Sequence, residues 1–586
     1  MNFHWIDLSI IAIYLVANAF LGIYIRKEAT KHTESYFLGD RNIAWWMLGL
    51  SGCSSYIDVG GTMALVGAMF YLGLKSIWMT HIFWGWLIIC FYMAFQAKYI
   101  RRSGVMTFAE WNVTRFGDTR HAEYARIAAA VFLLVLMTFN LVFMAVGTGK
   151  FAAEFLPLER WQAALVIFGV VGVYVTLGGM FGVILTDIFH TILIAIGVVI
   201  LTVMVFSNPA GSAFIGAKDP GWSSLMPTWK LWDGYLANTP AAYQHYYDFG
   251  TILLAGFGWL IFRVLAGPNV WDFQFFLSTK SPREASLAAG MWTVGYTLRW
   301  LLACAFLTLG IYYLGSEAKF DAEKIMPHVL MRLPVGLQGM FMAVLLAALM
   351  STLSSMINVT SSIITNDFLK RYVRKQLTQT QLVRYGQLAS VVVITIAFAF
   401  SLSFENIVSA WETMIFVVVT MILAPATMRW HWWRFSALAF VWSMIASAVL
   451  IMLQKALFAG WSAGVTLGVD TAATVVVTVA AGFLTKPTEM EVLVKFYSKV
   501  RPFGVWKPVR LESERRGLVP LGDPMPRIDM LNGFISIFFQ IGLALIPFYL
   551  FLRQWGPMAG AIAGVLALGV VLYFTWYRNL PSPDEV

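Results

Sequence analysis

Charged side chains are scarce in this sequence. Only 12% of its 586 residues are Asp, Glu, Lys or Arg, whereas 59% are hydrophobic and the mean hydropathy is +0.71. Soluble domains are about 25% charged and about 45–50% apolar, so this composition argues against a soluble protein. Apolar runs of about 20 residues recur along the chain, and each is long enough to cross a bilayer core about 30 Å thick. The sequence therefore predicts an all-α polytopic membrane protein.

Cysteine and histidine are too few and too scattered to form a recognisable site. Cys53, Cys90 and Cys304 all fall within apolar runs and form no CxxC pair, and the eight histidines show no HExxH spacing. We therefore expect neither a disulfide framework nor a zinc site. A membrane-embedded enzyme would need a positioned histidine or a nucleophile with its base. His190 and His245 are the nearest candidates, and nothing in the sequence pairs with them, so no catalytic residue is predicted.

The lengths of the apolar runs predict about fifteen transmembrane helices. The first run is too long for the core of a signal peptide and has no basic segment before it, so we expect it to be retained as a helix. An odd number of spans places the two termini on opposite sides of the membrane. The predicted spans lie near residues 5–25, 43–73, 77–100, 125–153, 160–177, 181–206, 247–267, 285–314, 336–365, 382–402, 406–427, 434–457, 466–485, 530–553 and 557–577.

Most of the 41 Lys and Arg residues fall in loops on one side of these predicted spans. They include Arg101, Arg102, Lys370 and Arg371, together with the segment 486–527. Basic loops mark the cytoplasmic side, so we expect an external N-terminus and a cytoplasmic C-terminus in the cell (inner) membrane. The net charge of +10 is then explained by these loops. We predict no nucleic-acid partner and no obligate protein partner.

Two long polar segments interrupt the series of spans. Residues 207–246 are rich in Gly, Pro, Ser and Trp and are predicted to form an external lid, whereas residues 486–529 are predicted to be cytoplasmic and partly helical. Neither is long enough to form a catalytic or signalling domain. The expected organisation is an extra helix and loop (1–42), a five-helix repeat (43–206), the external loop (207–246), a second, inverted five-helix repeat (247–427), two further helices (428–485), the cytoplasmic loop (486–529) and two C-terminal helices with a tail (530–586).

Two predicted helices are interrupted at corresponding places. In "SGCSSYIDVGGTMAL", Asp58 precedes Gly60 and Gly61, and in "LAGPNVWDFQFF", Gly267 precedes Pro268. Each interruption belongs to the first of five consecutive spans. Glycine and proline within a helix leave backbone groups without hydrogen-bond partners, and lipid cannot supply them, so these breaks should face a polar cavity. A matched pair of breaks favours an inverted-repeat secondary transporter with its binding site at the membrane midplane. The alternative is that both are ordinary kinks.

A third segment, "AALMSTLSSMINVTSSIITND" (Ala347–Asp367), is hydrophobic yet rich in hydroxyl groups. At 3.6 residues per turn, Ser351, Thr352 and Ser355 share one helix face. Such hydroxyls can bond their own helix or let neighbouring helices approach closely. Combined with carbonyls freed at a break, they would also offer neutral oxygen ligands. That set suits a monovalent cation such as sodium, because a tight divalent site needs several carboxylates.

At these segments the chain resembles the sodium/solute symporters, which include the sodium–glucose and sodium–proline cotransporters. The resemblance covers roughly residues 5–455 and is strongest at "AALMSTLSSMINVTSSIITNDF", "LGGMFGVILTDIFHT", "SYFLGDRNIAWWMLGLSGCSSYIDVGG" and "QFFLSTKSPREA". It implies an inverted five-helix repeat of the leucine-transporter type. It also implies that an inward sodium gradient drives solute uptake by alternating access.

The resemblance also implies ion sites. It places the principal sodium ion at the carbonyls of Ser54, Ile57 and Ala348 and the hydroxyls of Ser351 and Thr352, although the position of Ser54 is usually Ala in the family. In some members an acid matching this chain's Asp187 serves a second sodium ion with hydroxyls matching Ser351, Ser354 and Ser355. From the residues alone, a carboxylate within a span needs a cation or a structural partner such as an arginine.

The solute site is less well defined by the sequence. Carboxylates, amides and aromatic rings near the breaks would suit a polyol, because rings stack on sugar faces and polar groups bond hydroxyls. In sugar-transporting relatives, amide and aromatic residues just after the second break contact sugar, and Asn269 and Trp271 match them roughly. The lysine of those relatives corresponds to Tyr296, and Asp58 also departs from the family, where a small neutral residue is common. Two alternatives are open for Asp58: contact with a cationic or hydroxylated substrate, or pairing with Arg299. The candidate residues are Asp58, Gly60, Gly61, Asn269, Trp271, Asp272, Gln274, Tyr296, Arg299, Trp411 and Glu412.

We therefore expect a sodium-coupled symporter that imports a small polar solute, most simply a sugar or sugar derivative. A sodium- or proton-coupled transporter of an organic acid or amino acid is the main alternative. A channel, a sensor built on a transporter core and a membrane-embedded enzyme are more remote alternatives.

Overall fold

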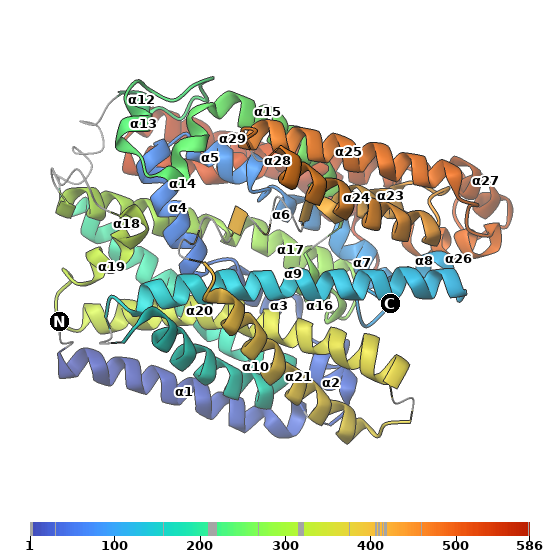
Figure 1. Cartoon of the computed structure of the whole chain (residues 1–586), viewed down its shortest axis with the longest axis horizontal. Helices are drawn as coiled ribbons and strands as arrows, with labels where there is room; N and C mark the ends of the chain where they lie inside the picture. Colours follow the sequence, from blue (N-terminus) through green and yellow to red (C-terminus); the bar gives the residue numbers. More distant parts are fainter. Residues whose placement is uncertain are drawn as a thin grey trace.

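The computed structural model is a bundle of long helices (Figure 1). Within the part of the chain that it describes, nine helices are long and apolar enough to cross a membrane, and eleven if each of two bent pairs counts as one span. The prediction of an all-α polytopic membrane protein is thus confirmed, while the count of fifteen spans stays a prediction, because the predicted span 406–427 lies partly outside the described residues. These are 4–29, 31–155, 158–208, 220–267, 269–314, 321–373, 376–404, 407, 411–412, 414, 419–458, 460–583 and 585.

The first half of the chain holds the first break and the longest helix. Its main helices are α1 (Trp5–Ala29), α2 (Thr33–Leu38), α3 (Trp45–Ser55), α4 (Val59–Leu72), α5 (Ser76–Trp78), α6 (Ile88–Phe91), α7 (Ala97–Ser103), α8 (Trp111–Phe116), α9 (Arg120–Ala152) and α10 (Arg160–Phe206). Three short helices follow in the loop predicted to form a lid, namely α12 (Pro220–Ser223), α13 (Tyr235–Asn238) and α14 (Ala241–Gln244).

The second half begins with α15 (Phe249–Leu265) and α16 (Val270–Leu277), which flank the second break. The remaining helices are α17 (Pro282–Gly295), α18 (Thr297–Leu314), α19 (Ile325–Leu330), α20 (Leu337–Ser362), α21 (Gln379–Ser401), α23 (Thr420–His431), α24 (Ala437–Leu457), α25 (Ala463–Leu484), α26 (Met490–Val500), α27 (Lys507–Arg515), α28 (Met525–Phe551) and α29 (Trp555–Thr575). The segment 486–529 is therefore partly helical, as predicted. In Figure 1 the N-terminus and α12–α14 lie towards one end of the bundle, and α26 and α27 lie at the other.

The first predicted break separates α3 from α4, and the two helices meet at an angle of 54°. The interruption falls at Tyr56 and Asp58 and not at the glycine pair that predicted it, since α4 already begins at Val59. Asp58 has extended backbone geometry, and its carboxylate accepts a hydrogen bond from the backbone N–H of Gly61. A capping carboxylate of this kind satisfies the free N–H groups of a helix start, so Asp58 stabilises the restart of the helix inside the bundle.

Three of the predicted spans are found, with two local irregularities. The two spans predicted at 160–177 and 181–206 correspond to the two segments of α10, which meet at a kink at Gly179, whose φ of 50° is unfavourable for any residue with a Cβ. The span predicted at 285–314 corresponds to α17 and α18, which meet at Tyr296 and together form one candidate span, Pro282–Leu314. A further bend of 47°, which the sequence did not predict, separates the helical segments Ser76–Phe83 and Ile88–Ser103. This last bend brings tryptophan side chains into the centre of the molecule.

Candidate functional site

The break between α3 and α4 lies directly against the hydroxyl-rich face of α20. The hydroxyl of Thr352 donates to the carbonyl of Ser55 at 2.9 Å, and the hydroxyl of Ser351 lies 2.9 Å from that of Ser54 and 3.3 Å from that of Ser55. All four side chains are buried. Oxygen atoms from segments almost 300 positions apart are therefore gathered in one place.

These contacts involve most of the residues predicted to hold a sodium ion. The carbonyl of Ala348 accepts from Thr352 at 3.2 Å, and the carbonyl of Ser54 accepts from the backbone N–H of Ile57 at 2.9 Å. Within the described residues, no group of three or more His, Cys, Asp and Glu side chains could hold a metal ion. Neutral hydroxyls and carbonyls are offered at the break by Ser54, Ser55, Ser351 and Thr352, and such a set suits a monovalent cation better than a divalent one.

Asp187 of α10 lies on the far side of the same cluster. Its Oδ2 accepts from the hydroxyl of Ser51 at 2.5 Å, its backbone carbonyl accepts from Ser54 at 3.4 Å, and its Oδ1 has no hydrogen-bond partner. No Lys or Arg among the described side chains lies within 4 Å of this carboxylate. The imidazole of His190 lies nearby, with its Nδ1 3.6 Å from Oδ1. The buried carboxylate therefore lies between the hydroxyl of Ser51 and the imidazole of His190.

His190 is in turn positioned by α1. Its Nε2 lies 2.9 Å from both the hydroxyl of Tyr14 and the side-chain oxygen of Asn18. The sequence did not predict that Ser51, His190 or Tyr14 would be part of this site. The spacing of His190, three residues after Asp187 on one helix face, was the available signal.

Ser354 and Ser355, which were predicted to join Asp187 at a second sodium site, bond their own helix. Their hydroxyls donate to the carbonyl of Ser351 at 2.8 Å and 3.1 Å. Their role at a second ion stays a prediction.

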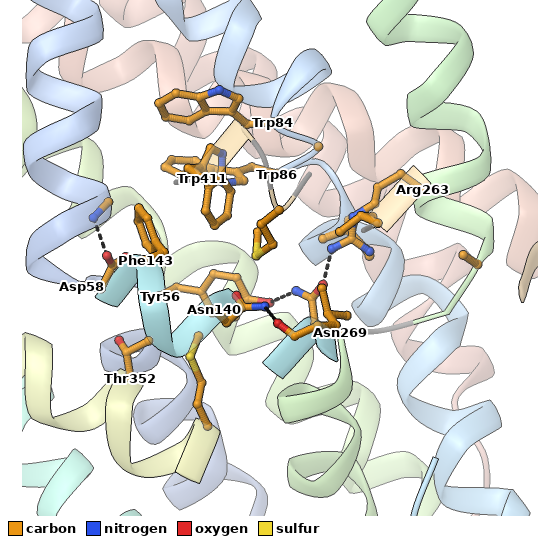
Figure 2. Close-up of a pocket in the computed structure, with 18 of the residues that line it drawn as sticks. Tyr56, Asp58, Trp84, Trp86, Asn140, Phe143, Arg263, Asn269, Thr352 and Trp411 are labelled. Atoms are coloured by element: carbon orange, nitrogen blue, oxygen red, sulfur yellow. Dashed lines mark hydrogen bonds between the residues drawn. The ribbon is translucent and has the colours of Figure 1, made fainter. Parts of the chain in front are cut away.

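A cavity of about 120 Å³ opens beside Asp58, on the opposite side of the break from Asp187. Figure 2 shows Trp84, Trp86 and Trp411 grouped at one end of it, with Asp58 and Thr352 at one side and Arg263 and Asn269 at the other. Thr352 therefore faces the cavity while its hydroxyl is bonded at the break. The residues that line the cavity include Tyr56, Asp58, Gly61, Trp84, Trp86, Asn140, Phe143, Arg263, Asn269, Arg299, Thr352 and Trp411.

Asp58 and Arg299 form an ion pair in the wall of this cavity. The guanidinium Nη2 lies 3.3 Å from the Asp58 carboxylate, and Nη1 donates to the carbonyl of Tyr56 at 2.6 Å. The ring of Trp86 lies 4.2 Å from the guanidinium carbon and covers it. The pair that the sequence left as one of two alternatives for Asp58 is therefore present.

The second break is joined to the first by tyrosine hydroxyls. Asp272 accepts hydrogen bonds from both Tyr56 and Tyr92, and Tyr92 also accepts from the backbone N–H of Asn269 at 3.0 Å. The side chain of Asn269 donates to the hydroxyl of Tyr56 at 3.1 Å and accepts from Arg263. Tyr56 therefore connects the start of α16 with the gap between α3 and α4. Tyr92 and Arg263 were not identified from the sequence.

The remaining predicted solute residues whose side chains are described lie outside the cavity lining. Gly60 packs closely against Gly147 of α9: a Cβ added to Gly147 would lie 2.7 Å from the Cα of Gly60. Tyr296 packs edge-on against Trp86. Glu412 accepts from Tyr246 at 2.6 Å. Gln274 accepts from Asn358 at 3.4 Å, and the side chain of Trp271 lies outside the described part of the structure. Their contact with solute stays a prediction.

Comparison with known proteins identifies the family. The sequence profile of the sodium:solute symporter family matches residues 36–447. This chain belongs to the sodium:solute symporter family. The symporter is 27% identical over 429 residues to a sodium/glucose cotransporter of Vibrio parahaemolyticus, in an alignment covering 67% of this chain and 74% of that protein. It is 26% identical over 435 residues to sodium/glucose cotransporter 1 of Sus scrofa, covering 67% of this chain and 62% of that protein, which is less than two thirds of its length.

The fold of this symporter is also found in a solved structure. The substrate-bound, outward-open structure of a sodium-coupled sialic acid symporter superimposes with a TM-score of 0.67 at 18% identity, covering 83% of this chain and 99% of that one. The predicted leucine-transporter-type fold is thereby confirmed. At this identity, the likeness concerns the fold alone.

Proposed function

We propose that this protein is a sodium-coupled symporter that imports a small polar solute, a sugar or sugar derivative, by alternating access, and that it has no enzymatic role. The observation that carries the proposal is the meeting of Ser351 and Thr352 with the break between α3 and α4. Buried hydroxyls and carbonyls, with the carboxylate of Asp187 bonded to Ser51 beside them, suit a weakly bound alkali cation better than a divalent one, which needs several carboxylates. The principal sodium ion would bind among Ser54, Ile57, Ala348, Ser351 and Thr352.

Coupling follows from the position of Thr352. This side chain bonds the break and also lines the cavity, so an ion held there ties α20 to α3 and shapes the wall that the solute touches. Sodium stabilises the outward-open state, solute binds, the outer side closes, and sodium leaves inward down its gradient. The ion acts by its differential affinity for the two states, and the coupling between ion and solute is reciprocal.

The proposal of a sugar rests on the cavity walls and on relatives that are named as sodium/glucose cotransporters. Three tryptophans offer flat faces for the CH surface of a sugar ring, and Asn140 and Asn269 offer amide groups for hydroxyls. The basic loops place the C-terminus in the cytoplasm and the N-terminus outside, in the cell membrane. The partners are then sodium, the solute and the bilayer.

A proton is the second candidate for a coupling ion. The neighbouring buried groups Asp187 and His190, each with one atom lacking a hydrogen-bond partner, favour it, because they can share a proton where a second sodium ion would otherwise bind. An amino acid or organic acid as solute has no comparable support in the cavity.

The test is uptake into proteoliposomes. Sugars, organic acids and amino acids are each offered with sodium or potassium outside, and with or without a proton gradient. We expect sugar uptake that requires sodium and persists when the proton gradient is collapsed. Uptake of every solute at the same rate in potassium would reject sodium coupling, and uptake that requires only the proton gradient would establish the second candidate.

A further inference from the structure

We infer that the Asp58–Arg299 ion pair recognises two neighbouring hydroxyl groups of an uncharged polyol and selects against solutes that carry a net charge. The inference deepens the proposed function and rests on it for the identity of the cavity as the solute site. Three residues, Asp58, Gly61 and Arg299, together carry out this recognition of solute hydroxyl groups.

The pair is a built feature of the cavity wall. A Cβ at residue 61 would lie 2.4 Å from Nη2 of Arg299 and 2.6 Å from Oδ1 of Asp58, so only glycine leaves room for it. Asp58 is fixed by its bond to the N–H of Gly61, and Arg299 by the carbonyl of Tyr56 and the ring of Trp86. Held from both sides, the two charged groups cannot rearrange freely around a ligand.

The same pair has unused hydrogen-bonding capacity. Nε and Nη2 of Arg299 are buried and have no hydrogen-bond partner, because the 3.3 Å contact with Asp58 is an ion pair without hydrogen-bond geometry. The two side chains are only 4% and 10% exposed, yet both line the cavity. Buried donors without partners are rare and costly in folded proteins. A hydroxyl can accept from the guanidinium and donate to the carboxylate, so a pair of adjacent hydroxyls satisfies both groups.

The charges around the cavity favour a neutral occupant. Besides this pair, the only charged side chain among the described lining residues is Arg263. Arg263 already donates to the side chain of Asn269. Within the ion pair, the carboxylate of Asp58 and the guanidinium of Arg299 offset each other. An additional charge brought by a solute would be desolvated without a counter-charge, which is unfavourable in a buried site.

The carboxylate of Asp58 also occupies the place where a solute anion would otherwise be attracted. Free N–H groups and the helix dipole make the start of α4 favourable for negative charge. Asp58 already accepts from one of these N–H groups, and Arg299 compensates its charge. A solute carboxylate would thus be repelled by the carboxylate of Asp58. A solute amine would find that carboxylate already paired with Arg299.

The experiment measures binding by the purified full-length protein in detergent, using quenching of tryptophan fluorescence in saturating sodium. The probes are three neutral polyols (D-glucose, D-galactose and myo-inositol) and charged counterparts (D-glucuronate, D-galacturonate and D-glucosamine). We expect at least one neutral polyol to bind the unaltered protein about tenfold or more tightly than its charged counterparts, a difference of about 1.4 kcal/mol or more. Repeating the titrations in potassium tests sodium dependence separately.

Two variants shift the charge balance in opposite directions. Asp58→Asn leaves Arg299 uncompensated, so the ratio of uronate to neutral affinity should rise about tenfold, whereas Arg299→Gln should raise the ratio for glucosamine. Gly61→Ala should weaken binding of the neutral polyol by displacing the pair.

Asp233→Asn and Arg384→Gln, which remove the same charges from exposed positions, are the matched controls and should leave every ratio unchanged. Size-exclusion profiles establish that each variant is folded.

Three outcomes overturn the inference. They are uronates or amino sugars binding the unaltered protein as tightly as the neutral polyols, no binding of any neutral polyol, and variants that weaken all probes equally. A shift in selectivity that occurs equally in sodium and in potassium would support the role of the ion pair while rejecting sodium coupling. The failure of the inference and the failure of the proposed function are thereby distinguished.

Discussion

Two stretches of α20 carry buried hydroxyl groups and use them differently. Ser351 and Thr352 contact the broken helix opposite them, at 2.9 Å from Ser54 and from the carbonyl of Ser55. One to four turns further along, the hydroxyls donate to carbonyls of their own helix at 2.6–3.1 Å; these belong to Ser354, Ser355, Thr360, Ser361 and, just beyond the α-helical part, Thr365. All of them are buried, so burial does not separate the two groups.

The difference lies in what stands opposite each stretch. Ser351 and Thr352 face the point where α3 ends, and the carbonyl of Ser55 there accepts from Thr352. The later hydroxyls donate to carbonyls of their own helix, as isolated Ser and Thr residues do in membrane helices. A hydroxyl-rich helix therefore indicates an ion site only where it passes a break in another helix.

The largest effect is expected at the first stretch. Ser351→Ala combined with Thr352→Ala removes two neutral ligands, so the sodium concentration for half-maximal uptake should rise about tenfold or more, equivalent to at least about 1.4 kcal/mol of binding free energy. Sodium titrations of uptake in proteoliposomes measure it. An unchanged sodium dependence in a folded double variant would place the ion elsewhere.

The next largest effect concerns Asp187. If the Oδ1 atom of Asp187 takes part in binding a second cation, Asp187→Asn should lower the Hill coefficient of sodium activation towards about one. Only one sodium site would then remain, and a single site shows no cooperativity. His190→Gln is a useful companion, since it removes the titratable partner and keeps Asp187 itself. A Hill coefficient equal to that of the unaltered protein would argue against a second ion at this carboxylate.

A smaller effect is expected at Ser354 and Ser355. Because both hydroxyls bond the carbonyl of Ser351, Ser354→Ala with Ser355→Ala should raise the half-maximal sodium concentration by no more than about threefold, through a slight shift of that residue. If the Hill coefficient falls as far as in Asp187→Asn, these two hydroxyls belong to the second ion site implied by the family resemblance.

The sequence was informative wherever local chemistry determines the structure. Hydrophobic run length predicts the helices, and residues that interrupt a helix predict the two breaks, because lipid leaves no other partners for backbone groups. Hydroxyl periodicity likewise predicted the face of α20 that meets α3. Each of these signals is contained in fewer than about 30 consecutive residues, the length of a long membrane helix.

Contacts between distant segments were harder to predict. Tyr92 reaches the second break only because the chain bends between Phe83 and Ile88, and nothing in "IFWGWLII" specifies the direction of that bend. Gly60 and Gly61 are adjacent and chemically identical, yet one packs against α9 and the other makes room for Arg299. The residue that each glycine contacts depends on how all the helices pack together. The local sequence around the two glycines does not predict that packing.

The smallest effect should come from the end of α20. Ser361→Ala with Thr365→Ala removes two hydrogen bonds to the carbonyls of Asn358 and Ser361, and the freed carbonyls keep their helical N–H partners. We expect the half-maximal sodium concentration to change by less than about twofold, and thermal unfolding in detergent to shift little, because such bonds to the helix's own carbonyls contribute little to helix stability. A sodium defect as large as that of Ser351→Ala with Thr352→Ala would mean that the ion contacts α20 along its length. The break between α3 and α4 would then no longer explain why two hydroxyls on this helix differ from the rest.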